Sequence, residues 1–274
     1  MIKEIRITNL DELLPLFTEQ EYREDLHRNR SSYIYRGLPD SSFKMKTSLA
    51  RNCKGLKQRL EPAILENFAK YAVIGDPSIA QSVWRQMIEG QHNGLPTRLL
   101  DWTHSALVGL HFATSEEDLE QMDKHDCCVW RIDMSEMVNL LPGRYQQLID
   151  SKEATIFSVD DLAAITGNSL MQYDDDMEDK AMVILEPPSI NQRIVNQYSF
   201  FAVVPMKITD IEDFLEKRTE RTVKYVIEAK LRWRVRDMLD QLNMSERIVY
   251  PGLGGLSKWI ARHYYVMEGV PPQA

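Results

Sequence analysis

The segment of residues 91–103, with the sequence QHNGLPTRLLDWT, concentrates polar side chains that can do chemistry. A histidine such as His92 can act near neutral pH as an acid, a base or a hydrogen-bond donor. Asp101 could orient this histidine, pair with Arg98 or anchor the loop to the backbone. The alternative interpretation is a rigid loop in which Arg98 and Asp101 form an ion pair and Trp102 fills the core. The sequence leaves both interpretations open.

The tripeptide Tyr35-Arg36-Gly37 is the second candidate for chemistry, because it ends a short strand that is rich in aromatic and β-branched residues. A guanidinium can bind phosphate or carboxylate through two parallel hydrogen bonds. Glycine would let a ligand approach the backbone at this point. The alternative interpretation is that Arg36 forms a structural ion pair with a core-facing carboxylate.

Glu186 is a third candidate, since it ends a predicted strand directly before two prolines. A glutamate at such a strand end could polarise a hydroxyl group or stabilise a cationic transition state. Arg193 and Gln197 follow it, ahead of the aromatic strand that contains Tyr198, Phe200 and Phe201. The alternative interpretation is that Glu186 is an ordinary solvated surface residue.

The stretch of residues 230–236 carries a basic cluster with one aromatic residue between its cations. Its members are Lys230, Arg232, Trp233, Arg234 and Arg236. Such a cluster could touch nucleic acid through phosphate contacts and stacking. On a helix, however, residues two positions apart are turned by about 200°, so the arginines do not share one face. Surface ion pairs with acidic neighbours are therefore the preferred interpretation.

The acidic residues between 174 and 179 are predicted to form a solvated loop. A magnesium site usually needs carboxylates that are held by rigid structure. The sequence therefore predicts no metal site.

Hydrophobic periodicity and capping signals predict the elements that must position these side chains. Helices are expected over residues 9–28, 60–73, 76–90, 106–113, 210–217, 229–242 and 255–264. Strands are expected over residues 33–35, 127–132, 181–186, 199–204 and 222–227, and a polar strand pattern covers residues 1–10. Gly90 is expected to end its helix, and residues 91–103 are expected to form a loop.

The irregular mixture of strands and helices predicts an α+β fold with a mixed, largely antiparallel central sheet and flanking helices. Residues 135–180 alternate short helical patterns with polar stretches, which indicates an inserted accessory lobe. The motifs are spread so widely that residues 1–274 are expected to fold as a single domain.

The composition excludes several classes of protein. The chain has 274 residues, a formal net charge of −8 and three cysteines, which lack the spacing of a zinc or disulfide framework. No window reaches the 18 or so apolar residues of a membrane helix, and the first residues do not resemble a signal peptide. A reduced, cytoplasmic protein that does not enter membranes is therefore expected. The acidic balance does not exclude a locally basic cleft.

The two motifs together resemble the FRG domain family, which is named for an aromatic-Arg-Gly motif. Tyr35-Arg36-Gly37 matches that motif with tyrosine in place of phenylalanine, and residues 91–103 match a longer second motif. The later family elements correspond to Arg193, Gln197 and Phe200, and then to Pro251, Leu253, Gly255 and Leu256; Gly254 stands where the family often has an acid. The resemblance extends from about residue 20 to residue 265.

The Arg-Gly pair at the end of an early strand is also similar to the first motif of ADP-ribosyltransferases. This similarity implies an ADP-ribosyltransferase-like core with NAD as substrate and no metal. It assigns the NAD-binding side chains to Tyr35, Arg36, Gly37, Gln91, Thr97, Arg98 and Tyr198. Arg36 would hold the pyrophosphate, His92 or Thr97 the ribose or nicotinamide, and Tyr35 or Tyr198 the ring.

The same similarity implies a catalytic carboxylate, which it assigns to Glu186, with Asp101 and Glu228 as the next choices. His92 and Asp101 complete the predicted catalytic group with Glu186. The serine-threonine motif on the second strand of many transferases could correspond to Thr47 and Ser48.

FRG domains often occur in bacterial and phage-conflict settings, which implies a toxin or an anti-phage defence effector. Such an enzyme would modify RNA, DNA or protein, and an antitoxin or other inhibitory partner could hold it inactive. The alternative is a non-catalytic module that binds nucleic acid or protein, with Arg232 and Arg234 touching RNA or DNA. A third hypothesis is a metal-independent hydrolase or nuclease that uses His92 and Asp101.

Overall fold

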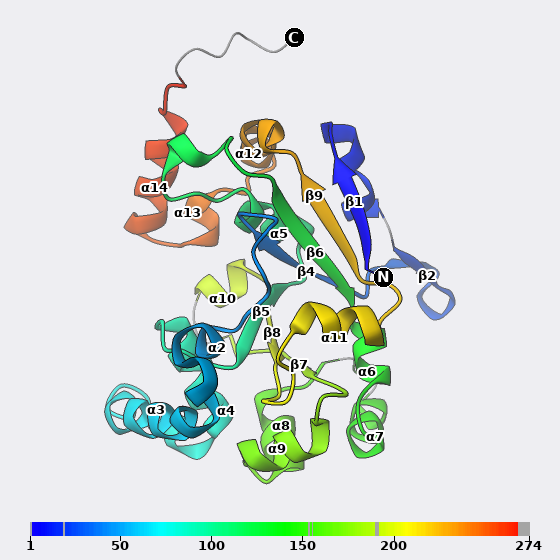
Figure 1. Ribbon diagram of the computed structural model, residues 1–274, viewed down its shortest axis with the longest axis vertical. Helices are drawn as coiled ribbons and strands as arrows, with labels where there is room; N and C mark the ends of the chain where they lie inside the picture. Colours follow the sequence, from blue (N-terminus) through cyan, green and yellow to red (C-terminus); the bar gives the residue numbers. More distant parts are fainter. Residues whose placement is uncertain (1, 19, 153, 155, 190–191, 268–274) are drawn as a thin grey trace.

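A seven-stranded sheet forms the centre of the protein in the computed structural model, which describes residues 2–18, 20–152, 154, 156–189 and 192–267 (Figure 1). The strand order is β1-β9-β6-β4-β5-β8-β7. The bounds are β1 Lys3–Ile7, β4 Tyr33–Leu38, β5 Leu99–Thr103, β6 Cys127–Asp133, β7 Val183–Leu185, β8 Ser199–Val203 and β9 Val223–Ile227. The β1–β9 pair is parallel and the other pairs in this sheet are antiparallel. The predicted α+β class with a mixed, largely antiparallel sheet is confirmed.

The two faces of the sheet bury alternate residues of β4 and β6, as the two-residue period of a strand requires. On one face, Ile34 and Trp130 pack with α6 (Met134–Asn139) and α11 (Ile211–Arg218). On the other face, Tyr35 and Val129 pack with α5 (Ala106–Ala113) and α12 (Arg232–Gln241). Because helices cover both faces, every residue of β6 is buried.

A third hydrophobic cluster joins the β5, β7 and β8 end of the sheet to a layer of helices. These helices are α3 (Lys57–Ala72), α4 (Val83–His92), α7 (Gly143–Ser151), α8 (Val159–Thr166) and α9 (Leu170–Met177). Tyr173 of α9 packs edge-on against Trp84 of α4, with ring centroids 5.3 Å apart. Its hydroxyl donates a hydrogen bond of 2.6 Å to the carbonyl of Val203. The helices of the predicted accessory lobe therefore share a core with α3 and α4, and the lobe's status as an insertion stays a prediction.

Shorter elements complete the fold. They are α1 Pro15–Thr18, α2 Ser48–Cys53, α10 Gln192–Asn196, α13 Glu246–Val249, α14 Leu253–His263 and the hairpin strands β2 Glu21–Arg23 and β3 Arg28–Arg30. The 3-10 turns are η1 Leu10–Leu13, η2 Glu24–Leu26, η3 Lys54–Leu56, η4 Pro77–Gln81, η5 Leu119–Gln121 and η6 Ala229–Leu231.

The long helix predicted over residues 9–28 is wrong. Asn9 does cap a turn, with the reciprocal capping-box contacts to Glu12, but the turn ends within four residues and α1 starts at Pro15. Beyond it, residues 21–30 form the β2–β3 hairpin, whose strand residues are all exposed. This stretch lacks the apolar stripe that would hold a helix against the core.

Two local predictions near the second motif also need correction. Gly90 does not end α4, which continues to His92; instead the amide of Leu95 donates to the carbonyl of Gly90 over 2.8 Å. The leucine side chain folds over the glycine, where an added Cβ would lie 2.6 Å from it. The segment expected to be a loop ends in strand β5, because its last residues pair with β4 and β8.

The acidic run does not form a solvated loop. Residues up to Met177 belong to α9, and three of the carboxylates are ion-paired, Glu178 with nearby Lys180 and the other two with residues far away in the chain. Asp174 contacts Arg98 at 2.7 Å, and Asp176 pairs with Arg144 and accepts a hydrogen bond from Tyr145. These pairs tie α9 to neighbouring elements, and no sequence pattern indicates such distant partners.

Candidate functional site

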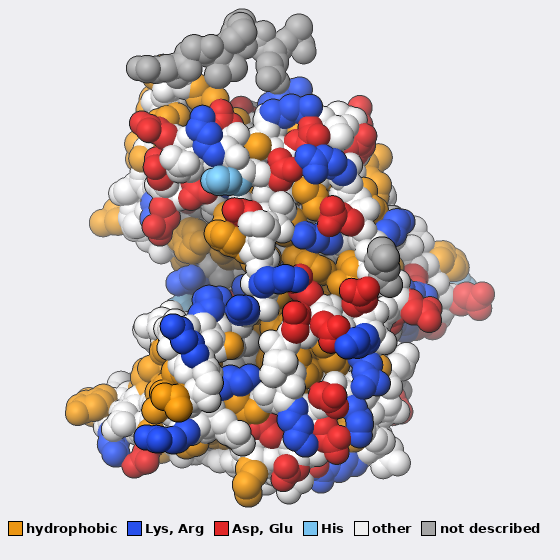
Figure 2. Space-filling model, viewed as in Figure 1, with side chains coloured by type: hydrophobic (Ala, Val, Ile, Leu, Met, Phe, Trp, Pro, Cys, Tyr) orange, Lys and Arg blue, Asp and Glu red, His pale blue; other side chains and the backbone are white. Residues whose placement is uncertain are grey.

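A cleft of about 280 Å³ lies where the ends of β4, β5 and α10 meet. Its lining includes Arg36, Gln91, Asp101, Thr103, Arg193 and Ser199. Figure 2 shows that the surface is hollowed near the position of β5 and α10 in Figure 1, and that Lys and Arg side chains border the hollow. The cleft therefore combines side chains from both sequence motifs with Arg193 and Gln197, which lie later in the chain.

Arg36 enters the cleft from β4. Its Nη1 donates a hydrogen bond of 2.6 Å to the backbone carbonyl of Asp101, and the Asp101 carboxylate lies 3.5 Å away. The side chain is 15% exposed, and its Nε has no hydrogen-bond partner among the described residues. Burial lowers the pKa of Arg36; the Asp101 charge opposes this shift, whereas the charge of Arg51 adds to it. The guanidinium thus has donors that the protein does not use.

A short relay of hydrogen bonds fixes the Asp101 carboxylate. The Thr97 hydroxyl donates to Gln91 Oε1 over 2.6 Å, which leaves the amide nitrogen of Gln91 pointing the other way. That nitrogen donates to both carboxylate oxygens of Asp101, at 3.2 and 3.3 Å. Thr97 is in turn held by Ser48, whose hydroxyl accepts from the Thr97 amide. The carboxylate remains accessible, because the Asp101 side chain is 58% exposed.

Arg193 and Gln197 form the opposite side of the cleft. The guanidinium of Arg193 lies 5.2 Å from the centre of the Tyr250 ring, and among the described residues no carboxylate pairs with it. Gln197 is anchored at both ends: its side chain donates to the carbonyl of Val249, and its own carbonyl accepts from Thr103. Arg193 therefore brings a second positive charge to the cleft without a neutralising carboxylate.

His92 lies at the end of α4, beside the cleft. Burial, and then the positive charge of Arg193, lower its pKa from the usual range. The imidazole is therefore neutral at pH 7. A neutral imidazole can accept a proton, but it cannot serve as a permanent positive charge for an anion.

Two residues predicted to contact a ligand, Arg98 and Thr97, are instead buried and bonded to other side chains of the protein. Arg98 is 2% exposed and binds Glu61 through two nitrogens, as well as Asp174. Neither the cofactor role nor the alternative pairing with Asp101 is supported for Arg98. Thr97 is 1% exposed, so it acts only through Gln91.

The two predicted aromatic contacts also differ from expectation. Tyr35 borders the cleft, but its ring is buried in the cluster under α5 and its hydroxyl donates to the carbonyl of Leu16 over 3.1 Å. Tyr198 is 58% exposed and is not among the cleft-lining residues. The structure therefore does not bring the two rings together over one ligand.

Gly37 lines the cleft, yet its lack of a side chain serves helix packing. A Cβ at this position would lie 2.1 Å from the Gly109 carbonyl oxygen and 2.3 Å from the Ala113 nitrogen, both in the backbone of α5. Any side chain would therefore push α5 off the sheet. The close approach of α5, and not the approach of a ligand, requires glycine here.

The predicted carboxylates are separated by the fold. Glu186 is exposed beyond the end of the edge strand β7 and does not line the cleft. Glu228 follows β9, where it pairs with Arg6 and Lys230. Of the three candidates, the structure brings only Asp101 to Arg36. Thr47 caps α2 and does not contact the cleft.

Some residues that line the cleft do not stand out in the amino-acid sequence. Phe112 and Ser199 line the cleft, although neither periodicity nor composition indicates them. Arg51, which influences the pKa of Arg36, lies in α2. The resemblance pointed to Arg193 and Gln197 ahead of the aromatic strand, and both line the cleft.

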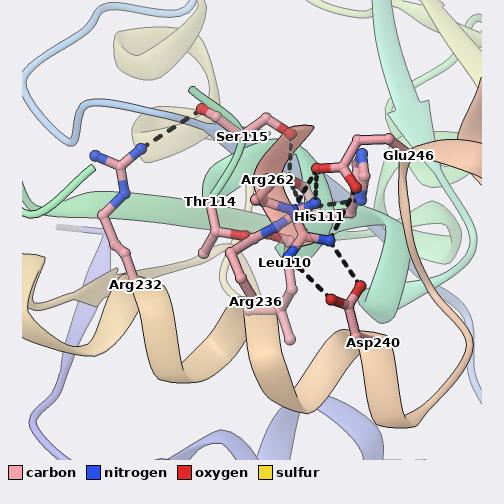
Figure 3. A network of polar contacts seen from close by, with 9 residues as sticks. All are labelled: Leu110, His111, Thr114, Ser115, Arg232, Arg236, Asp240, Glu246 and Arg262. Carbon is pink, nitrogen blue, oxygen red and sulfur yellow. Dashed lines mark hydrogen bonds and ion pairs between the residues drawn. The ribbon is translucent and has the colours of Figure 1, made fainter. Parts of the chain in front are cut away.

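The basic cluster of residues 230–236 is divided between the surface and the interior: exposed Lys230 pairs with Glu228, as predicted, whereas two of the arginines are not at the surface. Arg232 and Arg236 are fully buried, and only Arg234 among the three arginines is exposed. Figure 3 shows Arg236 directed toward His111 and Glu246. The hypothesis that Arg232 touches RNA or DNA is therefore wrong.

The segment of residues 251–256 positions Tyr250 near the cleft. Gly255 of α14 lies so close to the preceding turn that a Cβ would be 1.8 Å from the Tyr250 carbonyl oxygen. Gly252 has a φ of 102°, a left-handed conformation that favours glycine. This segment thus has a structural role, since it packs α14 against the residue that contacts Arg193.

Metal-binding groups, cysteines and membrane-spanning helices were considered for the described part of the chain. Within it, no group of three or more His, Cys, Asp or Glu side chains could hold a metal ion. The three cysteines are free, and two of them are buried. No helix among the described residues is long and apolar enough to cross a membrane.

Comparison with known families identifies residues 31–122 as an FRG domain. This range includes both Tyr35-Arg36-Gly37 and the segment 91–103, so the resemblance inferred from these motifs is confirmed. No match to a curated protein was found, and no solved structure matches the chain. The chain therefore contains an FRG domain whose two motifs meet in the cleft.

Proposed function

We propose that the cleft binds NAD and that the protein is an ADP-ribosyltransferase-like enzyme. The observation that carries this proposal is the meeting of Arg36, Arg193 and Asp101 in one cleft. Two guanidiniums with unused donors suit the pyrophosphate of a dinucleotide. A carboxylate beside them suits a reaction that develops positive charge on a ribose.

Asp101 takes the catalytic role in this proposal. The bond between the nicotinamide nitrogen and C1′ of the ribose breaks, and its electron pair leaves with nicotinamide. The C1′ centre becomes oxocarbenium-like, and the nearby carboxylate stabilises its charge. An acceptor hydroxyl, amine or base nitrogen then forms a bond to C1′ and gives its proton to the carboxylate. The relay from Thr97 through Gln91 holds the carboxylate in place for both steps.

The acceptor in this proposal belongs to a macromolecule, either a nucleic acid or a protein. In the bacterial and phage-conflict setting that the family resemblance implies, this glycosyl transfer would serve a cytoplasmic toxin or defence effector. An inhibitory partner would then hold the enzyme inactive. Growth arrest on expression of the wild-type chain, and normal growth with equal amounts of the Asp101→Asn chain, are expected. Normal growth with abundant wild-type protein would contradict the effector role.

The NAD proposal is tested by calorimetry and by release of nicotinamide. Arg36→Ala should weaken NAD binding by about 10–100-fold, because charge-assisted hydrogen bonds contribute about 1.5–3 kcal/mol each. Asp101→Asn keeps the backbone carbonyl that Arg36 binds, so this variant should still bind NAD. It should release nicotinamide at least about 100-fold more slowly than the wild-type protein.

The matched control is Arg234→Ala, which removes an exposed arginine that does not line the cleft. It should leave both NAD binding and nicotinamide release unchanged. Absence of NAD binding by the wild-type protein would refute the proposal. Binding without any turnover, in the presence of protein and nucleic-acid acceptors, would favour the non-catalytic module instead.

A further inference from the structure

A second pocket, larger than the cleft, lies between the end of α5, the residue after β4 and the helices α13 and α14. Its volume is about 530 Å³, which lies in the range of small-molecule sites. Its walls include Pro39, Leu119, Met122, Tyr250 and Ala261. These side chains are apolar or aromatic, so they suit a planar, uncharged group.

The second pocket adjoins the cleft. Along the end of β4, Gly37 lines the cleft and Pro39 lines the second pocket. Along the end of α5, Phe112 lines the cleft and Thr114 lines the second pocket. Tyr250 lines the second pocket, and its ring centre lies 6.3 Å from that of Phe112 and 5.2 Å from the Arg193 guanidinium, both of which line the cleft. A ligand that occupies the cleft could therefore extend past Tyr250.

The charges of the second pocket differ from those of the cleft. Two arginines stand behind it, Arg236 and Arg262, but Glu246 pairs with both (Figure 3). Arg262 also pairs with Asp240 at 2.7 Å. The hydrogen bonds of Arg262 and the charge of Arg236 outweigh the effect of burial and lower the pKa of Glu246 to about 2. These arginines are thus neutralised within the protein and do not attract an anion.

The polar groups that remain accessible are mostly acceptors. Glu116, which pairs with Arg232 at 3.5 Å, and the exposed Glu117 line the second pocket, together with the exposed Lys258, whose Nζ lies 5.8 Å from the Tyr250 ring centre. Carboxylates repel phosphate groups but accept hydrogen bonds from hydroxyl and amino groups. The second pocket therefore favours an uncharged group that carries hydroxyl or amino donors and a planar ring.

We infer that the second pocket binds the nucleoside part of a ligand whose phosphates lie in the cleft. This inference rests on the proposed function, because it takes the cleft as the phosphate site. In NAD, the reacting nicotinamide riboside must stay beside Asp101, which lines the cleft. The adenosine end is then the part that passes Tyr250 and enters the second pocket.

Calorimetry with pyrophosphate and with ADP tests this division. The wild-type protein should bind ADP at least 10-fold more tightly than pyrophosphate, since ADP adds a nucleoside to the same phosphates. Ala261→Trp fills the second pocket and should remove this advantage while pyrophosphate affinity is kept. Ile260→Trp is the matched control, because Ile260 is exposed on the same helix and does not line the second pocket. It should retain the full preference for ADP.

A milder variant covers the case in which Ala261→Trp fails to fold. Glu117→Gln changes an exposed side chain of the second pocket and should reduce the preference for ADP several-fold. Equal affinity of the wild-type protein for ADP and pyrophosphate would overturn the inference alone. An ADP preference that persists in both Ala261→Trp and Glu117→Gln would also overturn it. Absence of binding by either compound would refute the phosphate site in the cleft and, with it, the proposed function.

Discussion

Two groups of arginines in this protein differ in how far the fold neutralises them. The framework arginines, Arg98, Arg236 and Arg262, are nearly fully buried and pair with carboxylates. The cleft arginines, Arg36 and Arg193, line the cleft: Arg36 has only the exposed Asp101 carboxylate at 3.5 Å, and Arg193 pairs with no carboxylate among the described residues. Burying a charge without a partner is costly, so the framework arginines must carry their own carboxylates. The cleft arginines keep contact with solvent and can leave donors for a ligand.

The largest expected effect is on a framework arginine. Arg98→Met should lower the free energy of unfolding by about 3–5 kcal/mol, because Glu61 would remain buried without its cation. Urea denaturation followed by circular dichroism measures this loss. In the double variant Arg98→Met/Glu61→Gln the loss should be smaller than the sum of the two single losses. A loss below about 1 kcal/mol for Arg98→Met would break the distinction between the two groups.

The second prediction concerns the histidine that supports a framework arginine. Burial, and then the charge of Arg236, lower the pKa of His111 to about 3, although Glu246 opposes this shift and Arg262 adds to it. The unfolded chain takes up a proton near pH 6.5 and the folded chain does not, so stability is full above pH 6.5 and falls as the pH drops toward 3.

At pH 5.5, one unit below the unfolded value, this histidine should cost about 1.4 kcal/mol relative to pH 7.5. His111→Asn keeps a hydrogen-bond acceptor for Arg236 and should lose this part of the pH dependence. Urea denaturation at both pH values provides the comparison. An unchanged slope in His111→Asn would show that the buried imidazole is not its source.

The smallest expected effect is on the stability contributed by a cleft arginine. Arg36→Met should lower the free energy of unfolding by only about 1 kcal/mol, because it removes one hydrogen bond, to the Asp101 carbonyl, and an ion pair with a solvent-exposed carboxylate, which contributes little. The same denaturation assay applies, with Arg98→Met measured in parallel. If Arg36→Met were as destabilising as Arg98→Met, Arg36 would be a framework residue and the cleft would lose its main support as a ligand site.

Much of the fold follows from local patterns. Helix α5 covers residues 106–113 as its apolar spacing predicts, and strand β6 follows from a run of apolar and β-branched residues. The prediction of a long helix over residues 9–28 fails, because a capping signal indicates where a helix begins but not how long it is. The sequence pattern also does not predict strand β5, since Gly94 and Pro96 in the same segment indicate a loop. Pairing with β4 and β8 decides its conformation.

The site was predictable only where the two motifs together supplied both the residue and its neighbours. Arg36, Gln91 and Asp101 come from the two motifs and do meet in the cleft. Arg98 stands three residues before Asp101 and has the same polar character, yet its partners come from α3 and α9. Local spacing carries no information about such partners, so it could not separate a buried arginine from one at the cleft.

The amino-acid sequence by itself indicated the FRG domain within residues 31–122, the α+β fold class and the motif residues that line the cleft. Only the tertiary structure decided which charged side chains are neutralised inside the protein and which line the cleft. The physical reason is that a charge is neutralised by whatever lies within a few ångströms of it, and in this fold those neighbours come from elements far apart in the chain. Glu186 and Arg232 have the right side chains for chemistry, but the fold places one outside the cleft and buries the other.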